Sequence, residues 1–366
     1  MMLFSMYFDD STMQDWESEA FHSQACVADL MQMLGSPWAT EKSQGGAYIG
    51  DFLGLMHDVS RAEEGILLFW PRDSLVTKVL SIISIARETG LHAGMASKLY
   101  GVSNFMETGM YSRVGRAGLW AIKDRQKECA WWITPAISLS FDLLSDLFKL
   151  KPQREYLLWK GLLRRALTAS DAAYEGGKGS AGFLSVIDPG KPEETRLGRV
   201  IMLPASLYSL WGAQETYIAQ LELLAVLVAL IEVAGLVRGA NTIWFIDNIA
   251  ALMALVRGAS NSRSLDQMAK LVHLACFAIR SVPYFEYVES AANWADEISR
   301  KGTQGNWAPN NAFSVEKCGI AAELLTLPSL SVIGTLNICR SQGCWPWTWP
   351  AYLQHIAFSF QMLFGP

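Results

Sequence analysis

Residues 242–252 read T-I-W-F-I-D-N-I-A-A-L, and this stretch decides the fold class. The run 242–246 is typical of a strand buried on both faces, as in a parallel sheet. An acidic residue, Asp247, follows the run at once, and the spacing of apolar residues over 250–257 predicts a helix after it. The stretch therefore predicts one strand–helix unit of an α/β fold, with a carboxylate at the end of the strand.

Six further elements surround this unit, and their order predicts a mixed sheet with helices packed on it. Strands are expected at 166–172, 181–187, 199–204 and 284–288, and helices at 214–236 and 265–280. The glycine-rich segment E-G-G-K-G at 175–179 is typical of a hairpin between the first two strands.

Composition narrows the class of protein. Of 366 residues 51% are hydrophobic and 18% charged, so the chain can bury a large core. The most apolar stretch, 221–237, contains Glu222 and Glu232, which argues against a membrane span. No basic segment precedes an apolar one at the start, and the six cysteines form no C-x-x-C pair. We expect an intracellular protein, in the cytoplasm or nucleus and not secreted, without a structural zinc site.

Four acidic residues lie where this architecture would bring them together: Asp171, Glu222, Asp247 and Asp296, each flanked by apolar residues. A buried carboxylate is costly unless it is paired or binds a metal. Four such carboxylates could hold two Mg²⁺ ions, or Mn²⁺, about 4 Å apart, the arrangement that cleaves phosphodiesters. Taken singly, each acid could instead be a turn residue, a solvated helix position or a helix cap.

The same segments resemble the ribonuclease H domain of retroelements. The matching blocks are S-D-A-A with G-S-A-G-F-L (170–184), Q-L-E-L-L-A-V-L-V-A-L (220–230), F-I-D-N-I-A-A-L (245–252) and N-W-A-D-E-I-S-R (293–300). The resemblance implies an RNase H-like fold over 166–300, with the four acids as catalytic metal ligands. It gives Asn248 and Asn293 supporting roles, an RNA–DNA hybrid as partner, and no dinucleotide cofactor or membrane.

One departure from the family concerns turnover. Many members have a histidine before the last acid that is thought to assist product release, and no histidine lies between His273 and Asp296. We therefore expect slow turnover.

The front of the chain resembles a reverse transcriptase palm. Y-F-D-D (7–10), E-K-S-Q (41–44) and F-L-G-L (52–55) are similar to three palm blocks. Further along the chain, A-L-V-R-G (254–258) and N-W-A-D-E-I-S-R (293–300) resemble segments of DIRS-like or related retrotransposons. The resemblance makes Tyr7, Asp9 and Asp10 a remnant of the polymerase metal site and places Lys42 near the leaving pyrophosphate. Lys42 could equally be a surface lysine. A third palm aspartate does not precede Tyr7, so we expect a truncated palm without polymerase activity.

Charge along the chain predicts four regions. Residues 1–60 (net −8) would be the partial palm, 61–165 (net +6) a basic thumb or connection, 166–300 the RNase H-like domain, and 301–366 a poorly ordered tail. Nucleic-acid contacts are expected from Arg113, Arg116, Lys123, Arg125 and Lys127. Ordinary variation of surface charge is the alternative.

Two functions remain open from the sequence. The first is Mg²⁺-dependent endonucleolytic hydrolysis of the RNA strand of RNA–DNA hybrids. The second is a decayed, non-catalytic retroelement fragment that only binds nucleic acid. A proofreading-type exonuclease is rejected, because that class needs an Asp-x-Glu pair and residues 171–173 read D-A-A.

Overall fold

The computed structural model describes most of the chain. The described residues are 3–7, 10–14, 18–36, 45–110, 113–150, 153–158, 164–211, 213–279 and 281–320. Asp9, Lys42 and residues 321–366, which include most of the expected tail, lie outside them. Within the described part, none of the helices is both long and apolar enough to cross a membrane.

Residues 164–320, hereafter the six-stranded unit, are built on a mixed sheet with the order β11-β10-β7-β8-β9-β12. The strands are β7 (Arg165–Glu175), β8 (Lys178–Ile187), β9 (Thr195–Met202), β10 (Asn241–Ile246), β11 (Val282–Tyr287) and β12 (Ser314–Gly319). β7, β8 and β9 are antiparallel neighbours, whereas β10 runs parallel to both β7 and β11. The expected mixed sheet with flanking helices is confirmed.

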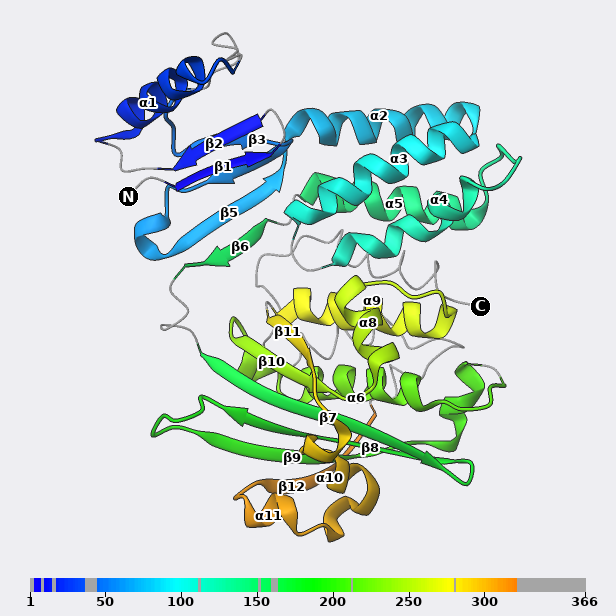
Figure 1. Cartoon of the computed structure of the whole chain (residues 1–366). Coiled ribbons are helices and arrows are strands. Elements are labelled where there is room, and N and C mark those ends of the chain that lie inside the picture. Colours follow the sequence, from blue (N-terminus) through cyan, green and yellow to red (C-terminus); the bar gives the residue numbers. More distant parts are fainter. Residues whose placement is uncertain are drawn as a thin grey trace.

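Helices cover both faces of this sheet (Figure 1). α6 (Ile218–Glu232), α7 (Ala234–Val237), α8 (Ile249–Arg257) and α9 (Arg263–Ile279) lie on one side, and α10 (Asp296–Lys301) and α11 (Trp307–Asn310) on the other. α6 is buried all round from Gln220 to Ile231, because it lies between the sheet and α9. The single helix expected at 214–236 is two helices in the structure, α6 from Ile218 to Glu232 and the short α7 from Ala234 to Val237.

β10 departs from the expectation of burial on both faces. Thr242, Trp244 and Ile246 face the helices and are buried, while Ile243 on the opposite face is 39% exposed. The short α10–α11 segment covers only part of that face, over Ala169 and Leu184. The apolar run therefore belongs to a strand that is only half covered.

The boundary expected at residue 300 is wrong. α10 crosses it, and β12 pairs in parallel with β9 at the edge of the sheet. Phe313, just before β12, belongs to the small core under α10. Residues 301–319 are therefore part of the six-stranded unit and not a poorly ordered tail.

The front of the molecule contains two smaller sheets. β1 (Leu3–Tyr7) and β2 (Asp10–Gln14) form a hairpin, and α1 (Ala20–Met33) follows it. A four-stranded antiparallel sheet combines β3 (Ile49–Phe52), β4 (Leu55–Asp58), β5 (Ile66–Pro71) and β6 (Arg154–Leu157). This sheet continues across residue 60, where the partial palm was expected to end. The F-L-G-L block (52–55) forms the turn of the β3–β4 hairpin, with positive φ at Leu53 and Gly54.

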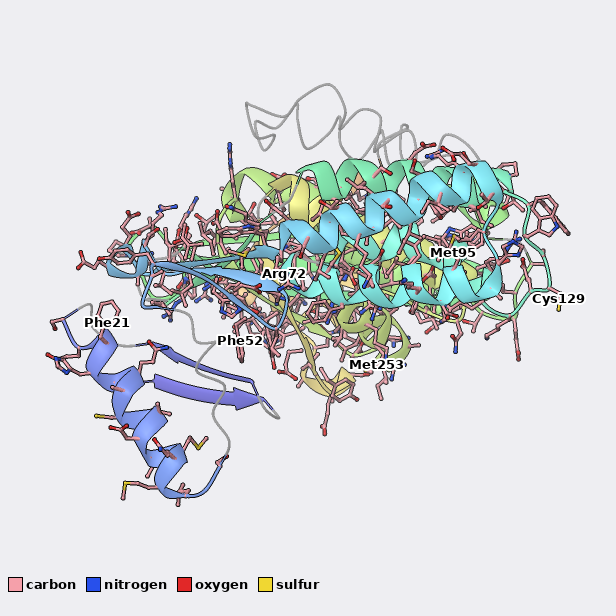
Figure 2. All side chains as sticks on the ribbon, turned by 90° about the horizontal axis from the view of Figure 1, so that it is seen from above. Phe21, Phe52, Arg72, Met95, Cys129 and Met253 are labelled. Carbon is pink, nitrogen blue, oxygen red and sulfur yellow. The ribbon has the colours of Figure 1, made fainter. Side chains whose placement is uncertain are left out.

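Between β5 and β6 the chain forms a helical region, residues 73–150. It contains α2 (Asp73–Thr89), α3 (Ala93–Met106), α4 (Trp120–Arg125) and α5 (Pro135–Leu150), with its own apolar core. Seen from above, Phe21 on α1 and Cys129 after α4 mark opposite ends of this front part (Figure 2). The helical region packs on the six-stranded unit through the 3-10 turn Val114–Leu119, which contacts α9.

Candidate metal-binding site

Three of the four expected carboxylates meet in the six-stranded unit. Asp171 lies on β7, Glu222 on α6, and Asp247 directly follows β10. One oxygen from each of these side chains lies within 4.8 Å of the others. We call Asp171, Glu222 and Asp247 the carboxylate trio. The parallel pairing of β10 with β7 carries Asp247 to the level of Asp171, and α6 crosses behind β7 to add Glu222.

A glycine opposite Asp171 lets α10 approach the site. Asp171 pairs with Gly182 on β8. A Cβ at Gly182 would lie 3.1 Å from Cγ2 of Ile298 and 3.0 Å from the carbonyl oxygen of Arg199, so only glycine fits without movement of its neighbours. This close contact brings the inner side of α10 against β7 and β8, and with it Ser299.

Glu222 is buried, and its two carboxylate oxygens differ in their hydrogen bonding. Its side chain is 2% exposed, and its Oε1 accepts a hydrogen bond from the backbone N–H of Ala172 at 3.2 Å. Its Oε2 is buried and has no hydrogen-bond partner among the described residues. Burial raises the pKa of Glu222 well above its usual value, and the nearby charges of Asp171 and Asp247 raise it further.

Asp171 is in a similar environment. Burial raises the pKa of Asp171 to about 7, and the charges of Asp247 and Asp296 act in the same direction, while a hydrogen bond from Ser299 opposes them. No basic side chain forms an ion pair with the trio among the described residues. Arg300 is close enough for its charge to oppose the rise in the pKa of Asp171, but it is paired with Asp296 and Glu175. Carboxylate oxygens that lie this close together, two of them on buried side chains, fit a hard divalent cation such as Mg²⁺ or Mn²⁺.

The fourth carboxylate, Asp296, stands outside the trio. It is the first residue of α10, and its Oδ1 accepts a hydrogen bond from Nε of Arg300 at 2.8 Å. Arg300 also donates to Glu175 at the end of β7, at 3.0 Å. Asp296 still contributes to the raised pKa of Asp171, so it lies near the trio but is paired with an arginine.

Asn248 and Asn293 hold backbone next to the acids. Oδ1 of Asn248 caps α8 by accepting from the N–H of Ala251 at 3.0 Å. Nδ2 of Asn293 donates to the carbonyl of Ser170 at 3.1 Å, and its Oδ1 accepts from the N–H of Ala295 at 3.1 Å. Asn293 thereby ties the segment before Asp296 to the strand that carries Asp171.

Ser299 and Arg300 were missed by the sequence reasoning. A helix places residues three and four positions apart on one face. In N-W-A-D-E-I-S-R the serine and arginine stand at those spacings from Asp296, so the signal was available once a helix beginning at Asp296 was assumed.

The basic residues expected to contact nucleic acid are only partly available. Lys123 and Lys127 are exposed. Arg116 forms an ion pair with the buried Glu107, and Arg113 packs against Gly258 at the end of α8. Arg125 is 1% exposed and lies over the ring of Trp132, so it is not a surface cation. These three arginines stabilise the helical region and its contact with the six-stranded unit.

The polymerase remnant is described only in part. The backbones of Tyr7 and Asp10 form the last pair of the β1–β2 hairpin. Asp9 and Lys42 lie outside the described residues.

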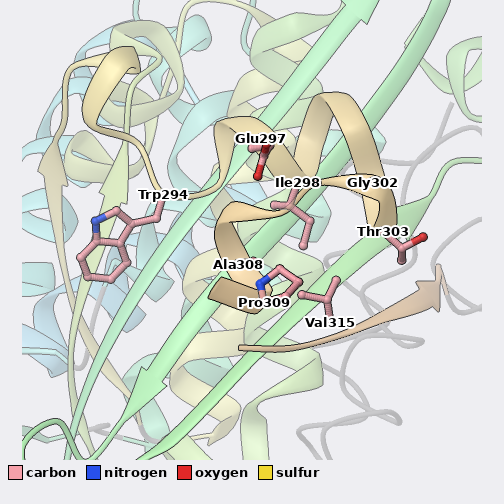
Figure 3. Close-up of a pocket in the computed structure, with 9 residues that line it drawn as sticks. Trp294, Glu297, Ile298, Gly302, Thr303, Ala308, Pro309 and Val315 are labelled. Atoms are coloured by element: carbon pink, nitrogen blue, oxygen red, sulfur yellow. The ribbon is translucent and has the colours of Figure 1, made fainter. Parts of the chain in front are cut away.

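A small pocket lies beside α10, and none of the trio residues lines it (Figure 3). It is bordered by Trp294, Ile298, Thr303, Pro309 and Val315. Its volume, about 10 Å³, is that of roughly one water molecule, so it is too small for a substrate.

Comparisons with known proteins give only weak structural likeness. No family model and no curated protein matches the chain. Among solved structures, a foamy viral protease-reverse transcriptase in complex with double-stranded DNA aligns with a TM-score of 0.35 and 13% sequence identity. The alignment covers 78% of this chain and 46% of that one, so this chain spans less than half the length of that protein. At this level the likeness carries no conclusion about activity.

Proposed function

We propose that the chain is a ribonuclease of the RNase H type, which hydrolyses the RNA strand of RNA–DNA hybrids with Mg²⁺ or Mn²⁺. The observation that carries the proposal is the carboxylate trio, in which the buried Oε2 of Glu222 has no partner in the part of the chain that the structure describes. The four sequence blocks that resemble RNase H support the substrate class. Each residue of the trio belongs to a different block.

The trio would hold the cation, and each member has a defined support. Asp171 is held by the central strand β7, Glu222 by the N–H of Ala172, and Asp247 by the capped start of α8. Bound divalent cations activate a water and stabilise the charge that develops on the phosphate. Asp296 would join as a ligand of a second ion after leaving Arg300. The products would carry a 3′-hydroxyl and a 5′-phosphate.

The RNA strand would be selected through its 2′-hydroxyl groups, since these distinguish RNA from DNA in a hybrid. The proposal also assigns the front part of the chain to the palm and to the thumb or connection of a reverse transcriptase. The exposed Lys123 and Lys127 would then contact phosphates.

A second candidate is a folded, non-catalytic protein that binds nucleic acid. The pairing of Asp296 with Arg300 favours it, because this pairing leaves three carboxylates where the two-ion reaction uses four.

The test uses the full chain with an RNA–DNA hybrid labelled on the 5′ end of the RNA, in the presence of Mg²⁺. Hybrid cleavage without cleavage of single-stranded RNA or duplex DNA is expected. Asp247→Asn should abolish it and leave the unfolding temperature of the metal-free protein unchanged or higher.

Two results would decide against the nuclease. Cleavage that survives in Asp247→Asn would come from a contaminating enzyme. Hybrid binding without cleavage by the unmodified chain would favour the second candidate.

A further inference from the structure

Ser299 is a buried hydroxyl on α10 that contacts the carboxylate trio from outside it. Its side chain is 1% exposed, and its Oγ donates a short hydrogen bond to Oδ2 of Asp171. The two residues are 128 positions apart, so the contact depends on how α10 packs on the sheet. Oγ also lies 2.9 Å from the carbonyl oxygen of Asp296.

The hydroxyl has one proton and therefore donates to only one of these two oxygens at a time. Hydrogen bonds to an ionised carboxylate are about twice as strong as those to a neutral carbonyl. When Asp171 is a metal-binding carboxylate, the proton is accordingly directed to Oδ2 of Asp171.

The backbone around Ser299 is held firmly in place. Ile298, its neighbour on α10, is 3% exposed and fills the space that Gly182 and Gly198 leave open on β8 and β9. A Cβ at Gly198 would lie 3.4 Å from Cδ1 of Ile298 and 2.5 Å from Leu184. α10 thus cannot shift on the sheet without opening this core, which keeps the Ser299 hydroxyl at a fixed place.

We propose that Ser299 is a positioning residue that sets the orientation of Asp171 for cation binding. A hydroxyl donor occupies one lone pair of the carboxylate and leaves the others to the ion, so it selects one rotation of the carboxyl group. Groups that orient a metal ligand in this way typically change metal affinity or activity about 10–100-fold when removed. This inference rests on the proposed function, because it assumes that the trio binds a cation.

The experiment measures cation binding directly, without nucleic acid. Mn²⁺ and Mg²⁺ are titrated calorimetrically into the full-length metal-free chain and into Ser299→Ala. A loss of affinity of about 10–100-fold is expected in the variant. The matched control is Ser185→Ala, which removes a fully buried hydroxyl on β8 that pairs with Thr168 at 2.9 Å. The control should keep the affinity of the unmodified chain.

A double-mutant cycle separates positioning from general stability. In an Asp171→Asn background, Ser299→Ala should cause no further loss of cation affinity. Ser299→Thr keeps the hydroxyl and should recover most of the affinity. If its added methyl group unfolds the protein, Ser299→Cys, a weaker donor of similar size, should give an affinity between those of serine and alanine.

The outcomes distinguish the two proposals. If the unmodified chain binds neither cation, the proposed function fails. If it binds them and Ser299→Ala binds equally well, or loses the same affinity with and without Asp171, the positioning role is wrong and the proposed function stands.

Discussion

Glu107 in the helical region and Glu222 in the six-stranded unit are both buried acids, yet the charges around them differ. Burial raises the pKa of Glu107 to about 7, and the guanidinium groups of Arg116 and Arg113 oppose that rise. Around Glu222 the nearest charges are carboxylates, which add to the effect of burial. Glu107 has a cation from the protein itself, whereas no described basic side chain forms an ion pair with Glu222. A buried acid that already has its cation stabilises the fold, and one that lacks it is a candidate ligand.

The comparison predicts opposite effects on the free energy of unfolding. Removing the arginine that pairs with Glu107 should destabilise the protein, whereas neutralising Glu222 should stabilise it. The larger effect is expected at Arg116. Arg116→Met should leave Glu107 buried without its partner and lower the free energy of unfolding by about 3 kcal/mol at pH 8. Without the arginine the pKa of Glu107 rises further, so this loss should shrink toward pH 5, where Glu107 takes up a proton. Urea unfolding of Arg116→Met and of the unmodified chain at pH 8 and at pH 5 measures this loss of stability.

The double variant Arg116→Met, Glu107→Gln is the control and should regain most of the stability at pH 8. A loss below about 1 kcal/mol in Arg116→Met would mean that the pair behaves like an exposed one. The contrast between the two buried acids would then be lost.

The second prediction concerns Glu222→Gln in the metal-free protein. Because the pKa of Glu222 is raised in the folded state, folding takes up a proton, and the stabilising effect of that proton is lost as the pH rises above the ordinary value of 4.5. The unmodified chain should therefore become less stable between pH 5 and pH 8. Glu222→Gln should flatten this decline and be more stable at pH 8 by about 1–3 kcal/mol.

Adding Mg²⁺ should reverse the order of the two proteins. The cation should restore the stability of the unmodified chain at pH 8 and have little effect on Glu222→Gln. Thermal unfolding with and without the ion measures this. If Glu222→Gln is destabilising without metal, the trio already has a compensating partner and is not an open cation site.

The trio was predictable from the sequence because it depends on short-range rules. A strand followed at once by an acid fixes Asp247, and the parallel pairing of β10 with β7 brings it level with Asp171, which lies inside the longer strand β7. The block S-A-G-F-L also contained Gly182, but its role was visible only when Ile298 was seen against it.

Other features depend on contacts that no local pattern records. The sequence of β12, S-V-E-K-C-G, is mostly polar and contains no apolar run. It is recognisable as a strand only from its pairing with β9. Arg125 was expected to contact nucleic acid because residues 61–165 carry a net charge of +6. Its burial beside Trp132 depends on the packing of α4 against the loop before α5, which net charge does not reveal.

The pairing of Asp296 with Arg300 gives the smallest expected effect and tests whether the fourth carboxylate can join the trio. Both side chains are partly exposed, so their ion pair contributes at most about 1 kcal/mol, and a cation could displace Arg300 at little cost. Arg300→Gln should free Asp296 and tighten Mn²⁺ binding by about fivefold at most, which is the equivalent of that free energy. Calorimetry without nucleic acid is the measurement, since any contact of Arg300 with a substrate would then not interfere. Arg61→Gln, which breaks an exposed pair with Glu64 in the front part of the chain, is the control and should change nothing. Weaker binding in Arg300→Gln would show that the arginine orients Asp296 for the ion and does not compete with it.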